Sequence, residues 1–210
     1  GTYLYTQISL TSLAPMSAPA KGGTLLTISG VNLQAVGIPP AVARCRVTYE
    51  APLPSGSAFD SLPLIALRND AAECSAIPTC GCTDPSAGCT LTVQLMRNGV
   101  DVDGTFALPC YIPLTLEALT PSAGPTGGGT VITVTGGPFT SSGGAPTPAH
   151  IWFGESKFIA QAGELAVVIT APAVSAAAYA DSSTQPLRVS LNAQDYSPSL
   201  EEAPRFTYYE

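Results

Sequence analysis

The chain has 210 residues, of which 45% are hydrophobic and 11% are charged, and its formal net charge is −7. This composition supports one large or two average cores and excludes a charge-rich disordered segment. The two lysines and six arginines are scattered and form no basic stripe, which argues against nucleic acid and an anionic membrane surface as partners.

Turns are frequent and long helices are not expected. Twenty glycines and twenty prolines are spread along the chain without a collagen period. No run of about 20 apolar residues is free of breakers. The nearest candidate, residues 158–180, contains Gly163, Glu164 and Pro172. No signal sequence opens the chain. We therefore expect no direct membrane contact by this segment and any leader or anchor to lie outside it.

The strongest signal is an internal repeat with a constant offset of 106 residues. Residues 13–30 read LAPMSAPAKGGTLLTISG, and residues 119–136 read LTPSAGPTGGGTVITVTG. Leu33 and Phe139 extend the match by one large apolar residue. Prolines, glycines and alternating apolar residues that recur at one offset predict two copies of one structural unit.

Each copy begins as a strand, a glycine turn and a second strand. In the second strand Leu26 and Ile28, like Ile132 and Val134, alternate with Thr or Ser, which predicts one core face and one wetter face.

Glycines and prolines set the connections of this opening motif. The glycines at 22–23 and 127–129 supply the positive φ angles that a tight turn needs. We expect Pro15 and Pro121 where an edge strand begins, because a missing amide donor does least harm there.

Later strands repeat more loosely. Residues 45–49 correspond to 150–153, and Cys74 to Pro78 corresponds to Thr170 to Pro172, each of these ending a short strand. A further half-buried strand is predicted in each copy from Leu91, Val93 and Leu95, matched with Leu187, Val189 and Leu191.

Two local patterns are interpreted as turns or loops. Asn98-Gly99 is a strong hairpin signal. The alanine-rich run 174–180 is short, uncapped and follows Pro172, so we expect a loop with at most one helical turn.

The aromatic pattern indicates where the units meet. Tyr5 and Tyr111 each precede the repeat by eight residues, and Phe206 to Tyr209 supplies another such strand. We expect residues 1–5 to end a preceding repeat or linker strand, with domains at 6–112 and 113–210 in a longer array. The connection around Tyr111 to Leu114 is so short that a stiff elbow is predicted.

The six cysteines are even in number and lie in the first half: Cys45, Cys74, Cys80, Cys82, Cys89 and Cys110. In a turn-rich, lysine-poor chain this pattern favours disulfides and an oxidising compartment. The alternative is a zinc cluster. Cys80-Gly-Cys82 lacks the usual spacer of zinc ligands and the only histidine, His150, lies in the other half, so we expect neither a metal nor a cofactor.

The repeated pattern resembles the opening of IPT/TIG domains, which are immunoglobulin-like β-sandwiches. The sequence from His150 to Gly154 is similar to their next strand, and Cys74 to Pro78 and Thr170 to Pro172 resemble the one after it. The resemblance implies an all-β fold of two tandem immunoglobulin-like sandwiches. It also implies a bridge between Cys45 and Cys74, as in extracellular relatives.

The other four cysteines depart from the family pattern, and three pairings are possible for them. Cys110 adjoins Tyr111 in the last strand of the first copy, so we expect one bridge to tie the 80–89 loop to that strand. The high Ala, Gly, Pro, Ser and Thr content resembles that of algal surface glycoproteins, including those that coat flagella.

Residues with chemical potential form no catalytic set, so we expect no enzyme. His150 has no triad-like partner motif and is interpreted as a surface histidine. Asp101-Val-Asp103-Gly104 lacks the remaining ligands of a calcium loop and is interpreted as a solvated turn. The glycines at 127–129 precede a strand, which excludes a phosphate loop. Isolated carboxylates such as Glu164, Glu201 and Glu202 give glycosidase chemistry no support.

Trp152 is predicted to face outward by alternation, covering an edge or a domain junction, with a sugar-stacking platform as the alternative. No Asn-x-Ser/Thr sequon occurs, whereas Thr140 to Pro148 is a stretch suited to O-linked sugars.

Our leading hypothesis is a structural or adhesive module of an extracellular or cell-surface glycoprotein array, a rigid spacer that contacts other domains of the array or another surface protein. The alternative is a carbohydrate-binding or accessory module of a secreted enzyme. An intracellular DNA-binding domain fails on charge and cysteines.

Overall fold

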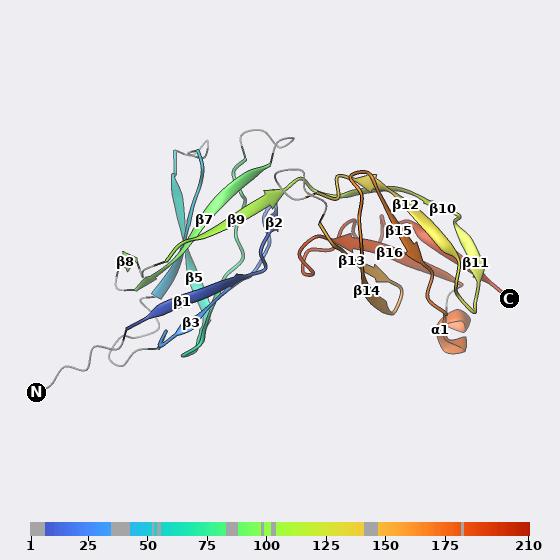
Figure 1. Cartoon of the computed structure of the whole chain (residues 1–210), viewed down its shortest axis with the longest axis horizontal. Coiled ribbons are helices and arrows are strands. Elements are labelled where there is room, and N and C mark those ends of the chain that lie inside the picture. Colours follow the sequence, from blue (N-terminus) through green and yellow to red (C-terminus); the bar gives the residue numbers. More distant parts are fainter. Residues whose placement is uncertain are drawn as a thin grey trace, which may run out of the picture. The chain divides into compact units, whose positions relative to one another are not determined.

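The computed structural model describes residues 7–34, 43–51, 53, 56–82, 88–97, 99–101, 104–140, 147–181 and 183–210. Over these residues the regular secondary structure is β-strand except for a single six-residue helix (Figure 1). It divides into two compact units, residues 1–111 and 112–210. The predicted all-β class is confirmed. The predicted preceding strand at residues 1–5 lies outside the described residues.

The first unit is a two-layer sandwich in which one strand belongs to both layers. Its sheet order is β1-β3-β6-β5-β4-β7-β9-β2, with β8 paired to β7. The first half of the nine-residue β5 pairs with β4, and its second half pairs with β6, so β5 passes from one layer to the other. The strands are β1 (Ser9–Ala14), β2 (Ala18–Pro19), β3 (Leu26–Val31), β4 (Ala43–Thr48), β5 (Phe59–Leu67), β6 (Ala71–Cys74), β7 (Cys89–Arg97), β8 (Val100–Asp101) and β9 (Phe106–Tyr111).

The second unit repeats this pairing order in two separate sheets, β10-β12-β15 and β11-β17-β16-β13-β14. Its shorter counterpart of β5, β14, pairs only with β13 and forms one edge of the five-stranded sheet. The elements are β10 (Thr115–Thr120), β11 (Ala123–Pro125), β12 (Val131–Gly137), β13 (Ala149–Phe153), β14 (Ser156–Ala160), β15 (Ala166–Thr170), α1 (Ala176–Asp181), β16 (Thr184–Ser190) and β17 (Arg205–Tyr209).

The predicted alternation in the opening motif is confirmed, since Leu26, Ile28, Ile132 and Val134 are all fully buried. The turn glycines are equally specific. Gly128 has a φ of +74°, and a Cβ there would lie 2.6 Å from the backbone nitrogen of Ala173. Any other residue would therefore have to displace backbone.

Pro15 and Pro121 lie elsewhere than predicted. Each follows the last residue of an edge strand, β1 or β10, through a cis peptide bond, rather than opening a strand. The edge location was correct, because a strand that pairs on one side tolerates the loss of an amide donor at its end.

The predicted match of residues 91–95 with residues 187–191 is wrong by two residues. In the structure Cys45 pairs with Leu95 while Ile151 pairs with Val189, so Leu95 corresponds to Val189 and not to Leu191. A period-two pattern looks the same after a shift of two residues, and only strand pairing resolves the register.

The alanine-rich run was also misread. Residues 176–181 form α1, and the Oγ of Ser175 accepts a hydrogen bond from the Ala178 amide at 3.1 Å. Ser175 is thus the N-cap that the sequence interpretation missed. The predicted hairpin is present where β7 pairs with β8 around Gly99, whereas Asn98 lies outside the described residues.

Candidate interaction surface

The three disulfides of the first unit tie its layers and loops together. Cys45 on β4 is bonded to Cys74 on β6, the pairing that the family resemblance implies. Cys80 is bonded to Cys110 on β9, and Cys82 to Cys89. The 80–89 loop is therefore tied to the last strand as predicted. The zinc alternative is wrong, because every cysteine is oxidised.

The second unit replaces these bonds with apolar and aromatic packing. Its residues at the places of Cys45 and Cys74, by strand register, are the buried Ile151 and Ile169. Where Cys110 anchors the last strand, Tyr208 donates a hydrogen bond from its hydroxyl to the carbonyl oxygen of Pro172 at 2.7 Å.

An aromatic cluster completes this core. The ring centroids of Phe206 and Tyr208 are 5.1 Å apart, and those of Phe153 and Phe206 are 5.6 Å apart with an edge-to-face angle of 83°. Such pairs stabilise a core beyond the area that they bury.

Outside this core, the outer face of the five-stranded sheet carries the most distinctive group of side chains. Trp152 on β13 lies directly opposite Lys157 on β14 and Arg188 on β16 in the strand register. The Nζ of Lys157 is 4.2 Å from the centroid of the Trp152 ring, and the guanidinium carbon of Arg188 is 5.4 Å from it. Both are cation–π distances, so two positive charges flank one indole.

A loop after β16 holds this group in place. The Nε and Nη2 of Arg188 donate hydrogen bonds to the carbonyl oxygens of Pro198 and Tyr196, each at 2.7 Å. The Tyr196 ring meets Trp152 edge-to-face with centroids 5.4 Å apart, and the indole Nε1 donates to the Gly154 carbonyl at 2.8 Å. Burial raises the pKa of Tyr196, and the charge of Arg188 opposes that rise.

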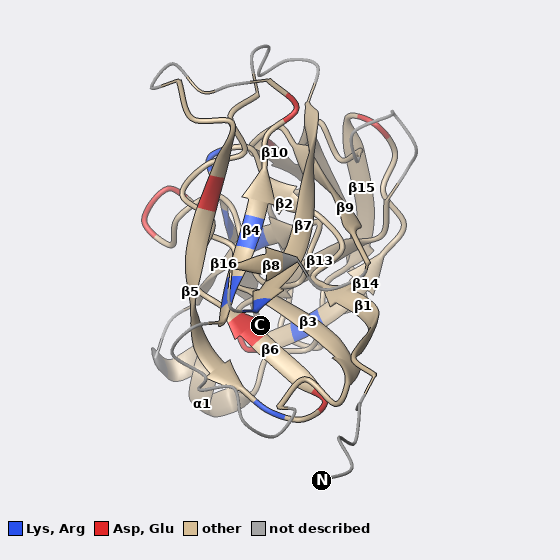
Figure 2. Ribbon diagram, turned by 90° about the vertical axis from the view of Figure 1, so that its left-hand side faces the viewer, with Lys and Arg blue, Asp and Glu red and all other residues tan. Residues whose placement is uncertain are grey.

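We define the cationic face by four residues: Trp152, Lys157, Arg188 and Arg205. Arg205 on β17 pairs with Pro186, two residues from Arg188 along β16, and so lies on the same side of the sheet. The three cations are the only Lys and Arg residues between positions 112 and 210, where eight Asp and Glu residues occur. Figure 2 shows how sparse the charged segments are along the ribbon.

The first unit carries a related pair at the same place. Arg46 occupies the β4 position that corresponds to Trp152, and its guanidinium carbon is 4.5 Å from the Phe59 ring centroid. Ser61 and Gln94 stand where the second unit has Lys157 and Arg188. The arrangement of one aromatic between two cations is thus specific to the second unit.

The prediction that Trp152 faces outward agrees with its half-buried position on β13, where Ile151 and Phe153 point into the core. A sugar-stacking platform needs an open ring face, whereas Lys157 lies over this ring. His150 lies on the same side of β13, opposite Ser190 and Ile159, and is half-buried. Lys157, Arg188 and Tyr196 were missed. The sequence signal for Lys157 and Arg188 was that every Lys and Arg of the second copy falls in its later strands.

Among the described residues, the other groups whose pKa values are displaced form no acid–base pair. Burial raises the pKa of Tyr49, as does its hydrogen bond to the Asp60 carboxylate. Burial raises the pKa of Tyr208 and lowers that of Arg97. These side chains lie in cores or at loop anchors.

One shallow pocket lies at the end of the second sandwich, between Gly154, Ser175 and Tyr208. Its volume of about 30 Å³ is far below the few hundred Å³ of an ordinary ligand site. Among the described residues no three His, Cys, Asp or Glu side chains gather in a way that could hold a metal. The described part of the chain also contains no helix long and apolar enough to cross a membrane.

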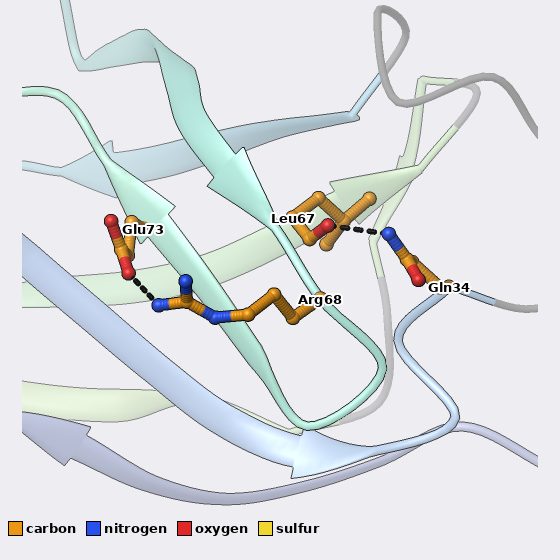
Figure 3. A network of polar contacts seen from close by, with 4 residues as sticks. All are labelled: Gln34, Leu67, Arg68 and Glu73. Carbon is orange, nitrogen blue, oxygen red and sulfur yellow. Dashed lines mark hydrogen bonds and ion pairs between the residues drawn. The ribbon is translucent and has the colours of Figure 1, made fainter.

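Polar contacts in the first unit were not predicted from the sequence. Arg68 forms an ion pair with Glu73, and the Gln34 side-chain amide donates to the Leu67 carbonyl at 2.6 Å (Figure 3). In the second unit Val168, 57% exposed, takes the place of Glu73. This position on the sandwich is therefore charged in one unit and uncharged in the other.

Several predicted turns and loops fall wholly or partly outside the described residues. Asp103 of the calcium-like turn is one of these, as are positions 141–146 of the stretch suited to O-linked sugars. Glu201 and Glu202 are exposed in a turn, where Glu202 accepts a hydrogen bond from the Ser199 hydroxyl at 2.8 Å. Glu164 contributes its backbone carbonyl to the Phe139 amide.

Two facing layers of strands in this order define each unit as an immunoglobulin-like β-sandwich. Residues 114–208 match the family model of the IPT/TIG domain. The second unit is an IPT/TIG domain, and the first unit repeats its strand order.

Solved structures that contain several domains or modules are similar to the chain. The chain is 16% identical to the plexin A4 full extracellular region, with a TM-score of 0.49. This match covers 97% of the present chain and 16% of the plexin chain. It is 13% identical to the chicken CNTN1 FN1–FN3 domains, with a TM-score of 0.34, and this match covers 88% of the present chain and 65% of the CNTN1 chain. The fibronectin(III)-like modules of Clostridium thermocellum CbhA are 12% identical to the chain, with a TM-score of 0.32. This match covers 91% of the present chain and 90% of the CbhA chain. No curated protein matches the sequence.

Proposed function

We propose that the chain is a non-catalytic module of an extracellular or cell-surface array, in which it acts as a rigid spacer and as a protein-contact surface. Three disulfides in the first unit suit an oxidising compartment. The displaced pKa values of Tyr49 and Tyr208 belong to structural side chains, and the pocket beside Tyr208 has a volume of only about 30 Å³.

The observation that carries the spacer role is the connection between the units. The carbonyl oxygen of Tyr111 accepts a hydrogen bond from Ala20 within the first unit, and that of Leu114 accepts one from Ser197 within the second. Only Ile112 and Pro113 lie between these anchors. Proline fixes its own φ and restricts the residue before it to extended conformations, so few backbone torsions remain free.

A distance measurement tests the spacer role. Spin labels are placed at the exposed residues Thr92 on β7 and Thr207 on β17, and their separation is measured by pulsed electron resonance. We expect one narrow distance distribution. The matched control inserts a short Gly-Ser segment between Ile112 and Pro113, which broadens the distribution. A native distribution as broad as that of the control contradicts the spacer role.

The contact role assigns the other domains of the array and a second surface protein as partners. Its support is the cationic face, which lies on a rigid sheet and not on a loop. O-linked glycans on the chain, and a flagellar or cell-wall location, belong to the same proposal and rest on composition. Sedimentation of the chain with a candidate surface partner tests the contact role, and the absence of any complex at high concentration leaves only the spacer.

A further inference from the structure

The second unit is acidic overall, yet it gathers every positive charge on one face. Eight acidic and three basic residues between positions 112 and 210 give a formal charge of −5, and all three basic residues lie on the cationic face. Cations that only served solubility would be interspersed with the carboxylates. Their collection beside the single tryptophan of the chain makes this face electrostatically unlike its surroundings.

The cations are also held in position by neutral groups and not by carboxylates of the described residues. Among the described residues no carboxylate forms an ion pair with Lys157, whose ammonium group lies over the Trp152 and Tyr196 rings. Arg188 is held by the carbonyl oxygens of the loop through Nε and Nη2, and its Nη1 has no described acceptor. An aromatic ring and two neutral carbonyl groups orient these cations and leave their positive charges uncompensated.

The spacing of the charges is within reach of alternate side chains of an extended acidic chain. Lys157 and Arg188 lie two strands apart, and neighbouring strands are about 4.8 Å apart. Residues i and i+2 of an extended peptide lie on one side, about 6.7 Å apart. Two glutamates at that spacing can therefore reach both cations with their side chains.

We propose that the cationic face binds an acidic segment of a partner protein, one with glutamate or aspartate at alternate positions. This rests on the proposed contact role and names the chemistry of the partner. Carboxylates bind the Lys157 ammonium and the Arg188 Nη1, and Arg205 extends the positive strip by one strand. Ile159, 62% exposed and two residues from Lys157 on β14, offers apolar contact next to this charge.

An acidic protein segment fits this face better than a sugar does. A neutral sugar would have to stack on Trp152, whose ring lies beneath Lys157. A sulfated polysaccharide has a dense, regular charge that suits a continuous row of Lys and Arg. This face instead has three cations spread over β14, β16 and β17 with Trp152 and Pro186 between them.

The test uses the whole chain and the fluorescence of Trp152, which reports on this face alone because the chain has no other tryptophan. The probe is a 12-residue synthetic peptide with glutamate alternating with threonine. The control probe has glutamine in place of each glutamate. We expect the glutamate peptide to change Trp152 emission saturably, binding more weakly as salt rises, and the glutamine peptide to have no effect.

Substitutions then locate the site. Because an exposed charge pair contributes modestly, Lys157→Gln and Arg205→Gln are each expected to weaken binding roughly three-fold, and the double variant about ten-fold. Lys157→Arg retains binding. Lys21→Gln removes the only other lysine, exposed in the first unit, and leaves binding unchanged. Where a substitution changes the Trp152 emission before peptide is added, the affinity of that variant is measured by calorimetric titration as well.

Any of four results overturns the proposal. The first two are equal binding of the glutamine peptide and native affinity in the double variant. The third is tighter binding of a heparin fragment than of the glutamate peptide, and the fourth is a salt-sensitive dimerisation that Lys157→Gln abolishes, because a second copy of the chain would then be the occupant. If none of the probes binds while a complex with a surface partner still forms, this proposal fails and the contact role stands. A broad distance distribution between the spin labels affects the spacer role alone.

Discussion

The Cys45–Cys74 disulfide allows one unit of the chain to be destabilised while the other serves as its control. We replace both cysteines with alanine. The bond closes a sequence separation of 29 residues, and the chain-entropy relation for a loop of that length gives a stabilisation of about 3.6 kcal/mol. Both cysteines are fully buried, so the loss of two sulfur atoms adds a packing cost in the same direction.

For a domain of this size, each kcal/mol shifts the melting temperature by roughly 4–8 °C, so the first unit should melt roughly 15–30 °C lower. The second unit contains no cysteine and should be unaffected. The same relation gives about 2.4 kcal/mol for the Cys82–Cys89 bond, whose separation is 7 residues, and predicts a smaller shift for its alanine pair.

Two signals separate the units in this experiment. The emission of Trp152 follows the second unit alone, whereas the heat-capacity trace follows both. We expect a new low-temperature transition in calorimetry and an unchanged melting curve by tryptophan fluorescence. If the first transition moves by less than about 5 °C, or if the fluorescence transition moves with it, then the entropy estimate or the independence of the units is wrong.

Three further predictions concern local features. Gly128→Ala should lower the stability of the second unit by at least about 2 kcal/mol, because the backbone of residues 171–173 blocks the new Cβ, whereas Gly127→Ala meets no atom and should be neutral in the same denaturation assay. The raised pKa of Tyr208 contributes stability that is present below its unfolded pKa of about 10 and is lost as pH rises through the folded value. Tyr208→Phe should therefore weaken the alkaline fall in the melting temperature of the second unit. Glu73→Gln should cost less than about 1 kcal/mol in urea unfolding of the first unit, since its ion pair with Arg68 is exposed.

The fold class could be read from the chain because its signals are local and occur twice. Alternating apolar residues in β3 and β12 need only the pleat of a strand to become a core face. The glycines before them meet a backbone requirement that is equally local. A repeat at constant offset then confirms each copy by the other.

Errors arose where local patterns were ambiguous. Ser175 could be recognised as a helix cap only once its hydroxyl was seen to face the Ala178 amide. The shift of two residues at Val189 arose because a strand presents the same face every second residue. Neither ambiguity can be removed without knowing which groups are hydrogen-bonded.

The sequence by itself determined that this chain builds two strand-rich units with a short connection, because alternation, turn glycines and repetition act over a few residues. Only the tertiary structure decided that Lys157 and Arg188 flank Trp152, and that Cys80 pairs with Cys110. These relations join residues that are distant along the chain. They depend on strand register and on packing between layers, which are set when the whole sandwich forms.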